Sequence, residues 1–432
     1  MNFYNLKHKE EQLNFKEATI KGQGKDKGLF FPEDISKFSN EFLQNLPNLS
    51  NEEIAFQVMK DFAGDEIPEA ELRKIVAETI AFDIPLKKVT ENISVLELFH
   101  GPTLAFKDVG ARFMSRCLGY FLKNETRKVT VLVATSGDTG GAVANGFYAV
   151  EGIEVVILYP KNRVSPVQEK QLTALGKNIH ALEVNGSFDD CQALVKQAFS
   201  DESLTEKLLL TSANSINAAR WLPQQIYYVL ALKQWLKIHS ENPVICVPSG
   251  NFGNICAGIL AHHRGLPVEH FIAACNVNDV VPEYLRTEIL QPKETVATIS
   301  NAMDVGDPSN FVRILELFDK EFNQVKNKLS GYTIDDEETL KFIERVEKDY
   351  GYVLDPHGAV AFVALEKYLT ENDGKGFFLE TAHPVKFPDS VEQATGKSVE
   401  IPKSLEELMK QEKFTTEINP QYEELKEFLL KK

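Results

Sequence analysis

Short apolar runs alternate with longer amphipathic stretches through most of the chain. Apolar runs that predict buried strands lie at residues 93–98, 129–134, 155–159, 179–184, 208–211, 244–247, 271–274 and 377–379. Helical spacing follows several of these runs, as in residues 188–199. Strand, loop and helix repeated at this spacing are typical of parallel α/β sheets, which bind ligands beside the carboxyl ends of their strands. Two such series, beginning near residues 128 and 244, predict two α/β units facing one cleft.

The two ends of the chain have a different pattern. Residues 40–62 and 68–82 carry apolar side chains at helical spacing, and the segment after residue 403 is charged and helical. Several domains are expected, because 432 residues exceed one compact core. The predicted domains are a helical N-terminal domain at 1–95, a loop with a smaller α/β domain at 96–215, a larger α/β domain at 216–400 and a helical tail at 401–432.

Composition is that of an ordinary soluble globular protein, with 43% apolar and 25% charged residues. The formal net charge of −16 opposes contact with phosphate backbones, so we expect no nucleic-acid partner. The sequence has no signal-like apolar stretch near its N-terminus and no apolar run long enough to span a bilayer. Five cysteines without a C-x-x-C pair indicate buried free thiols. We therefore predict a cytoplasmic protein without membrane contact.

Lys107 is the strongest candidate for chemistry in this sequence. It directly follows the apolar residues 104–106 and precedes Asp108. An apolar, partly desolvated setting lowers the pKa of a lysine amine, and only the neutral amine attacks a carbonyl carbon. The plain alternative is a solvated cation at a helix start. The position of the lysine between apolar neighbours and two downstream glycine-rich loops favours the chemical interpretation.

Two glycine-rich loops follow predicted strands. The first, at residues 136–141, opens a helix, and the free N–H groups of a helix start suit a carboxylate. The second, at residues 250–254, has two glycines, two asparagines and no acidic side chain, which suits a phosphate monoester held without a metal. Asparagine also tolerates the left-handed backbone of such nests. Each loop could instead be an ordinary tight turn. Neither matches a P-loop or a dinucleotide fingerprint, so nucleotide binding is a weaker hypothesis.

Four further residues are candidates for binding or structural roles beside these loops. Thr381 follows the predicted strand 377–379, and a hydroxyl there would leave a pyridine nitrogen neutral. Arg220 could bind a phosphate in a forked geometry. His383 and Asp355 are interpreted as structural, Asp355 as a helix N-cap before a proline. A reactive lysine, a phosphate nest and a carboxylate nest together predict an enzyme that uses pyridoxal 5'-phosphate (PLP).

These segments together resemble the threonine synthases, a PLP-dependent family of fold type II, the tryptophan synthase β-like group. The matching segments are HGPTLAFKD at 100–108, ATSGDTG at 134–140, NSIN at 214–217, PSGNFGN at 248–254, SNAMD at 300–304 and TAHPVKF at 381–387. They occur in the family's order along nearly the whole chain. The resemblance implies two facing parallel-sheet α/β domains with a helical N-terminal extension. It also implies that the smaller domain holds the substrate and the larger one the cofactor.

The resemblance also implies roles for individual residues. It makes Lys107 the catalytic lysine that binds the aldehyde of the cofactor. The implied cofactor-binding residues are Lys107, Asp138, Gly250, Asn251, Phe252, Gly253, Asn254 and Thr381. The implied substrate-binding residues are Ser136, Thr139, Ser215 and Arg220, and no metal is implied. The implied reaction converts O-phospho-L-homoserine and water into L-threonine and phosphate, with Lys107 as general base once the substrate amine has displaced it.

Other functions remain as hypotheses at this point. A serine or threonine dehydratase, or a β-replacement enzyme of the same fold, needs no second phosphate site, so Arg220 discriminates against it. A non-catalytic relative that binds a phosphorylated metabolite has no use for Lys107. The predicted partner is a small-molecule substrate, and we expect a monomer or weak dimer.

Overall fold

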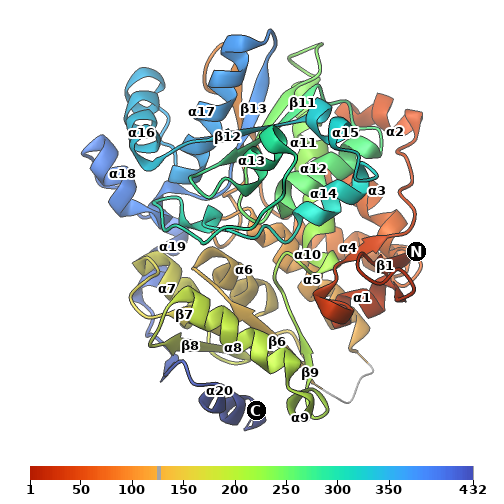
Figure 1. Cartoon of the computed structure of the whole chain (residues 1–432), viewed down its shortest axis with the longest axis vertical. Coiled ribbons are helices and arrows are strands. Elements are labelled where there is room, and N and C mark those ends of the chain that lie inside the picture. The colour runs from red at the N-terminus through yellow and green to blue at the C-terminus, as the bar shows by residue number, and fades with distance from the viewer. Residues whose placement is uncertain (124–127, 432) are drawn as a thin grey trace.

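The larger lobe is built on a six-stranded sheet (Figure 1). The computed structural model of the chain describes residues 1–123 and 128–431. In spatial order the strands are β12 (Leu329–Thr333), β11 (His270–Cys275), β10 (Val244–Pro248), β13 (Gly376–Glu380), β5 (Ile93–Glu97) and β4 (Leu86–Lys88). Neighbouring strands are parallel except at the β4 edge, where β4 pairs antiparallel with β5. The carboxyl ends of five strands therefore point the same way, as the apolar runs predicted.

The smaller lobe is built on a five-stranded sheet in which every neighbouring pair is parallel. In spatial order the strands are β14 (Thr415–Ile418), β8 (Ile179–Val184), β7 (Ile153–Pro160), β6 (Val129–Ala134) and β9 (Leu209–Thr211). Strand β14 comes from the C-terminal segment, for which helical spacing predicted only helices. A strand of four residues, with only Ile418 buried, cannot be separated from a loop by its pattern alone.

Helices cover both sheets, and Figure 1 shows the two lobes one above the other with helices around each sheet. The helices of the smaller lobe and its connections are α5 (Lys107–Phe121), α6 (Asp138–Phe147), α7 (Pro166–Thr173), α8 (Phe188–Ser200), α9 (Glu202–Thr205), α19 (Lys403–Lys410) and α20 (Tyr422–Leu430). Those of the larger lobe are α10 (Ala218–Trp221), α11 (Gln225–Trp235), α12 (Gly253–His263), α13 (Val280–Thr287), α14 (Phe311–Leu317), α15 (Phe322–Lys328), α16 (Asp336–Tyr350), α17 (Pro356–Glu371) and α18 (Pro388–Thr395).

The N-terminal segment combines helices with a small antiparallel sheet. Its elements are β1 (Asn2–Asn5), β2 (Gln12–Asn14), α1 (Phe15–Lys21), β3 (Phe30–Pro32), α2 (Asn40–Asn45), α3 (Asn51–Ala63) and α4 (Glu69–Thr79). The order β2-β1-β3 is a correction to the helical expectation for this segment, because strands of three or four residues leave little alternation to read. The chain then enters the larger sheet at β4 and β5, crosses to the smaller lobe through α5, and returns after β9.

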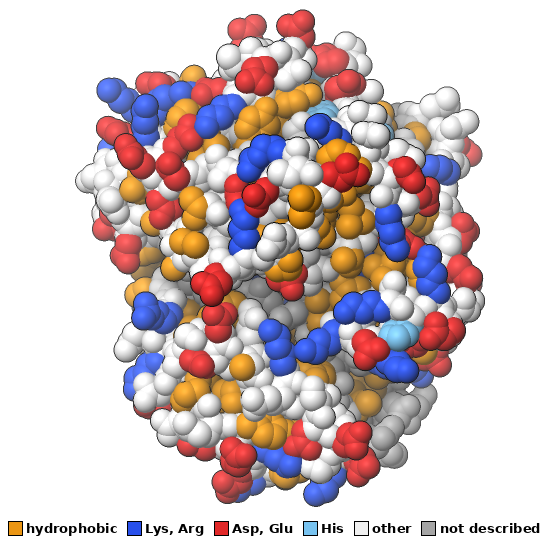
Figure 2. Space-filling view, in the orientation of Figure 1, with side chains coloured by type: hydrophobic (Ala, Val, Ile, Leu, Met, Phe, Trp, Pro, Cys, Tyr) orange, Lys and Arg blue, Asp and Glu red, His pale blue; other side chains and the backbone are white. Residues whose placement is uncertain are grey.

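The cores of both lobes consist of strand side chains under helices. Val95, Cys246 and Phe378 lie in the core of the larger lobe, and Val156 and Leu182 in that of the smaller one. All five cysteines are buried free thiols, as predicted. Within the described part of the chain, every helix is too short or too polar to traverse a bilayer. Figure 2 shows acidic and basic side chains interspersed over one face of the molecule.

Candidate active site

Lys107 begins α5, just beyond the carboxyl end of β5. The segment before it is held by an isolated antiparallel bridge between Ala105 and Ala382, and the Phe106 N–H donates to the Thr381 carbonyl at 2.9 Å. Thr381 itself follows β13, the neighbour of β5 in the sheet. The structure thus brings Lys107 and Thr381, which are distant in the sequence, to one edge of the larger sheet, where two parallel strands end.

The Lys107 amine is largely enclosed and lies beside Asp138 of the smaller lobe. Its Nζ is 3.5 Å from Asp138 Oδ2, and the side chain is 16% exposed. Burial is the largest influence on its pKa and lowers it; Asp138 opposes that shift, while Lys386 and Arg220 add to it. The pKa of Lys107 is consequently lower than that of an ordinary lysine. This is the property that the apolar neighbours of Lys107 predicted.

Asp138 is oriented by groups from several elements. Its Oδ1 accepts hydrogen bonds from Lys386 Nζ at 2.7 Å and from Gln168 Nε2 at 2.9 Å. Burial alone would raise its pKa, but Lys386 and Lys107 hold the pKa of this carboxyl well below its usual range. Asp138 is therefore an oriented carboxylate. The sequence offered no separate signal for Lys386 beyond its place in the 381–387 segment.

The 250–254 loop joins β10 to α12 and has an unusual backbone. Phe252 has φ of 61° and takes the left-handed conformation, which the sequence had led us to expect at an asparagine. A side chain other than hydrogen at Gly250 would meet Met303 Cα at 2.6 Å, so the loop needs glycine there. Asn254 Nδ2 is buried without a hydrogen-bond partner among the described residues. A left-handed residue beside a glycine and an unpaired amide is the arrangement of an anion nest.

Ser215 lies against this loop. A Cβ at Gly253 would approach Ser215 Cβ at 3.3 Å, and Ser215 Oγ accepts a hydrogen bond from Asn310 Nδ2 at 3.0 Å. The buried Arg313 donates to the carbonyl of Ser215 at 3.1 Å and to that of Phe30 in β3 at 3.0 Å. The N-terminal segment therefore helps to hold Ser215 in place, a link that the sequence pattern did not indicate.

Arg220 lies in the short helix α10, which follows Ser215 in the chain. It is 4% exposed, and its Nε and Nη1 have no hydrogen-bond partner among the described residues. Gly110 of α5 leaves room for it, since a Cβ there would lie 3.2 Å from Arg220 Nε. Burial lowers the pKa of Arg220 to about 10, so the side chain remains charged at neutral pH. A buried guanidinium with unused donors is suited to an anion.

The 136–141 loop begins α6 with Gly137 at φ of 136°, where a Cβ would lie 2.5 Å from Gln168. The N–H groups of Gly137 and Gly140 both donate to Thr135 Oγ1 at 2.9 Å. Two donors of the loop therefore already have an internal acceptor. Ser136 and Thr139 are half-buried. A carboxylate bound at this loop would therefore accept hydrogen bonds from their hydroxyls and from the other N–H groups of the loop.

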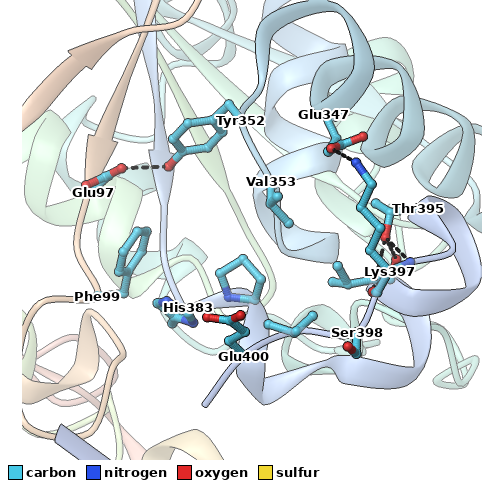
Figure 3. A pocket seen from close by; sticks show the side chains of 13 residues that line it. Glu97, Phe99, Glu347, Tyr352, Val353, His383, Thr395, Lys397, Ser398 and Glu400 are labelled. Atoms are coloured by element: carbon cyan, nitrogen blue, oxygen red, sulfur yellow. Dashed lines mark hydrogen bonds and ion pairs between the residues drawn. The ribbon is translucent and has the colours of Figure 1, made fainter. Parts of the chain in front are cut away.

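The turn after Thr381 has structural roles. Asp355 is the N-cap of α17 and accepts from the His357 N–H, as predicted. His383 Nδ1 accepts from the Val385 N–H at 3.1 Å and caps the short helix η5 (Pro384–Lys386). A cavity of about 410 Å³ adjoins this turn, with His383 beside Phe99 on its wall (Figure 3). The residues lining it include none of those to which the resemblance gives a cofactor or substrate role.

Two buried acids lie directly behind Thr381. The Asp355 N–H donates to Glu380 Oε1 at 2.6 Å, and each of the two acids has one oxygen without a partner among the described residues. Burial and the neighbouring Asp355 raise the pKa of Glu380 well above its usual value. This pair was not predicted, because burial of an acid is a tertiary property.

The fold and site define a PLP-dependent enzyme of fold type II. A family described as pyridoxal-phosphate dependent enzymes matches residues 83–376. The threonine synthase N terminus and C-terminal families match residues 2–80 and 358–429. Threonine synthases of Haemophilus influenzae and Escherichia coli are 46% and 47% identical, covering 100% and 94% of this chain and the same shares of their own. The chain belongs to the threonine synthase family.

Solved structures agree with this assignment. The crystal structure of Escherichia coli threonine synthase aligns with a TM-score of 0.93 at 44% identity and covers 100% of both chains. PLP-bound threonine synthase from Brucella melitensis aligns with a TM-score of 0.93 at 35% identity, covering 99% of this chain and 98% of its own. Maize serine racemase, at 16% identity and a TM-score of 0.54, shares the fold alone. The predicted fold class and cofactor are confirmed.

Proposed function

We propose that this protein converts O-phospho-L-homoserine and water into L-threonine and phosphate. Membership of the threonine synthase family over the full length of the chain supports this reaction. Two groups carry the proposal, and they are close enough for their charges to interact: the largely enclosed amine of Lys107, whose pKa is lowered, and the buried guanidinium of Arg220, which has two unpaired nitrogens. One group suits an aldehyde cofactor and the other a second phosphate, which belongs to the substrate.

The residues present fit PLP. Lys107 would hold the aldehyde, the 250–254 loop and the free amide of Asn254 would hold the phosphate, and Thr381 would face the ring nitrogen. When bound, PLP supplies the electron sink that makes protons beside the substrate amine acidic. Asp138, oriented by Lys386 and Gln168, would lie at the cofactor hydroxyl.

The chain's own residues supply proton transfer and anion binding. Lys107 Nζ, when it is neutral, takes the proton from the α-carbon of the substrate and then one from the β-carbon. Phosphate leaves from the γ-carbon, hydroxide from water adds at the β-carbon, and the two protons that were taken are returned to the γ- and α-carbons, which gives threonine. Arg220 and Ser215 would bind the phosphate group, and the Arg220 donors gain most as charge develops on the leaving oxygen. Ser136 and Thr139 would bind the substrate carboxylate at the start of α6.

Phosphate release tests this function directly. The purified protein is incubated with O-phospho-L-homoserine, with and without added PLP, and phosphate and threonine are measured together. Equal amounts of both products, dependent on PLP, are expected, with no keto acid from serine or threonine as substrates. Keto acid from serine at a comparable rate, without phosphate release from phosphohomoserine, would favour the dehydratase hypothesis. Lys107→Ala provides the inactive control.

A further inference from the structure

Lys386 is a fully buried lysine that links the two lobes. It lies in η5, beyond β13 of the larger sheet, and its Nζ donates to the Thr103 carbonyl at 2.8 Å and to Asp138 Oδ1 at 2.7 Å. Asp138 begins α6, in the smaller lobe. A buried ammonium group loses its hydration and is stable only with close acceptors. Lys386 therefore lies between Thr103, in the loop that precedes Lys107, and the Asp138 carboxylate that faces Lys107.

The geometry of Asp138 divides its two oxygens between two lysines. Oδ1 accepts from Lys386 and Gln168, both within 2.9 Å, whereas Oδ2 is 3.5 Å from Lys107 Nζ. Both contacts are ion pairs, and the one from Lys386 is the shorter. The charge of the carboxylate is thus balanced mainly by Lys386. A carboxylate buried beside Lys107 alone would instead stabilise the protonated form of that amine.

The other charged groups around this pair do not replace Lys386. Arg220 of α10 interacts with Lys107 as a further cation. Asp108 of α5 accepts from the N–H and Oγ1 of Thr103, and its interaction with Lys386 is weaker than those hydrogen bonds. The hydroxyl of Tyr227 in α11 donates a hydrogen bond to the Phe106 carbonyl, and this side chain is uncharged. Lys386 is therefore the cation that contacts Asp138 most closely.

We propose that Lys386 is a positioning residue that serves as the counter-ion of Asp138, so that this carboxylate does not hold the Lys107 amine in its protonated form. The role rests on the proposed function, because a neutral amine matters only if Lys107 attacks an aldehyde and accepts protons. Since Lys386 and Asp138 belong to different lobes, the same contact ties the protonation of Lys107 to the relative position of the lobes.

The protonation of Lys107 can be measured without turnover. The full-length protein, freed of cofactor, is pulse-labelled with acetic anhydride from pH 6 to 11, and acetylation of Lys107 is followed by peptide mass spectrometry, with exposed Lys403 as internal reference. In Lys386→Gln, the midpoint for Lys107 should rise by about one pH unit or more, a loss of roughly tenfold in neutral amine at pH 7. Lys397→Gln, which removes a surface lysine paired with Glu347, should leave it unchanged.

A second variant keeps the test decisive if Lys386→Gln folds poorly. Asp138→Asn removes the carboxylate and leaves two lysines facing each other, so the Lys107 midpoint should fall. Asp138→Asn combined with Lys386→Gln should cancel the rise seen in Lys386→Gln alone. In the loaded enzyme, the acidic limb of the kcat/KM profile should shift with the labelling midpoints. An unchanged midpoint in folded Lys386→Gln, or a raised one in Asp138→Asn, would overturn the proposal. Neither outcome depends on which substrate the enzyme uses.

Discussion

A buried guanidinium with unused donors is a costly feature for a protein to keep. Arg220 is such a residue. Burial removes its hydration, and its Nε and Nη1 have no hydrogen-bond partner among the described residues. The sequence does not distinguish a buried arginine from a surface one, so a forked contact to phosphate was only one interpretation of Arg220. The family resemblance then assigned that phosphate to the substrate. The burial that supports it came from the packing of α5 against α10.

Truncation of Arg220 should separate substrate binding from cofactor binding. In Arg220→Ala, the KM for phosphohomoserine should rise at least tenfold, because a charge-assisted contact to phosphate contributes about 1.5–3 kcal/mol. The dissociation constant for PLP should change by less than about twofold. Arg112→Ala on the adjacent helix, whose guanidinium bonds to the Glu78 carbonyl, is the matched control. Equal effects on both ligands would place Arg220 at the cofactor instead.

At the scale of elements, the C-terminal segment completes the smaller lobe. Strand β14 pairs with β8 along the edge of the sheet, and α20 packs on α8. Ile418, Leu425 and Leu429 are buried in the same core as Leu182 and Leu194. The amphipathic spacing of α20 was visible in the sequence, but the partner that covers its apolar face was not, because it lies more than two hundred residues earlier in the chain.

Leu425→Ala should therefore destabilise the smaller lobe. Removing a wholly buried leucine side chain leaves a cavity and costs about 2–5 kcal/mol. Phe414→Ala, in the same segment but 56% exposed, should change the free energy of unfolding by less than about 0.5 kcal/mol. Urea unfolding followed by tryptophan fluorescence and circular dichroism measures both. Similar stabilities for the two variants would mean that the tail does not contribute to the folded core.

On the scale of the whole molecule, half-buried neutral histidines make the fold sensitive to acid. Burial lowers the pKa values of His263, His270 and His383 to about 4. A histidine with a lowered folded pKa contributes stability above its unfolded pKa of about 6.5, and that contribution is lost as the pH falls from 6.5 towards 4. Each of the three histidines should therefore lower the free energy of unfolding at pH 5 by roughly 1–2 kcal/mol relative to its value at neutral pH.

His270→Asn gives a direct check of this acid sensitivity. His270 bonds to Ser330 Oγ at 2.8 Å and stacks on Tyr368, so its ring is enclosed. The difference in unfolding free energy between pH 7 and pH 5 should be smaller in the variant than in the parent protein by roughly 1–2 kcal/mol. Urea midpoints at both pH values supply the measurement. The same difference in both proteins would show that His270 does not titrate in this range.

The sequence by itself determined the local features of this protein. Apolar runs fixed by β propensity and burial placed strands β5, β6, β7, β8, β9, β10, β11 and β13 close to where they lie. Glycine and asparagine spacing located both loops, and the apolar neighbours of Lys107 predicted an amine of lowered pKa. These features depend on residues within a few positions of each other, so a linear pattern contains them.

Only the tertiary structure decided how distant groups meet. Two contacts join segments that lie far apart in the chain: the bridge between Ala105 and Ala382, and the ion pair from Lys386 to Asp138. The burial of Arg220 likewise depends on packing between distant elements. Desolvation and Coulomb interactions depend on distance in space, and the chain's order does not encode that distance directly. For this reason the lysine could be predicted from its neighbours, whereas the charges that set its protonation could not.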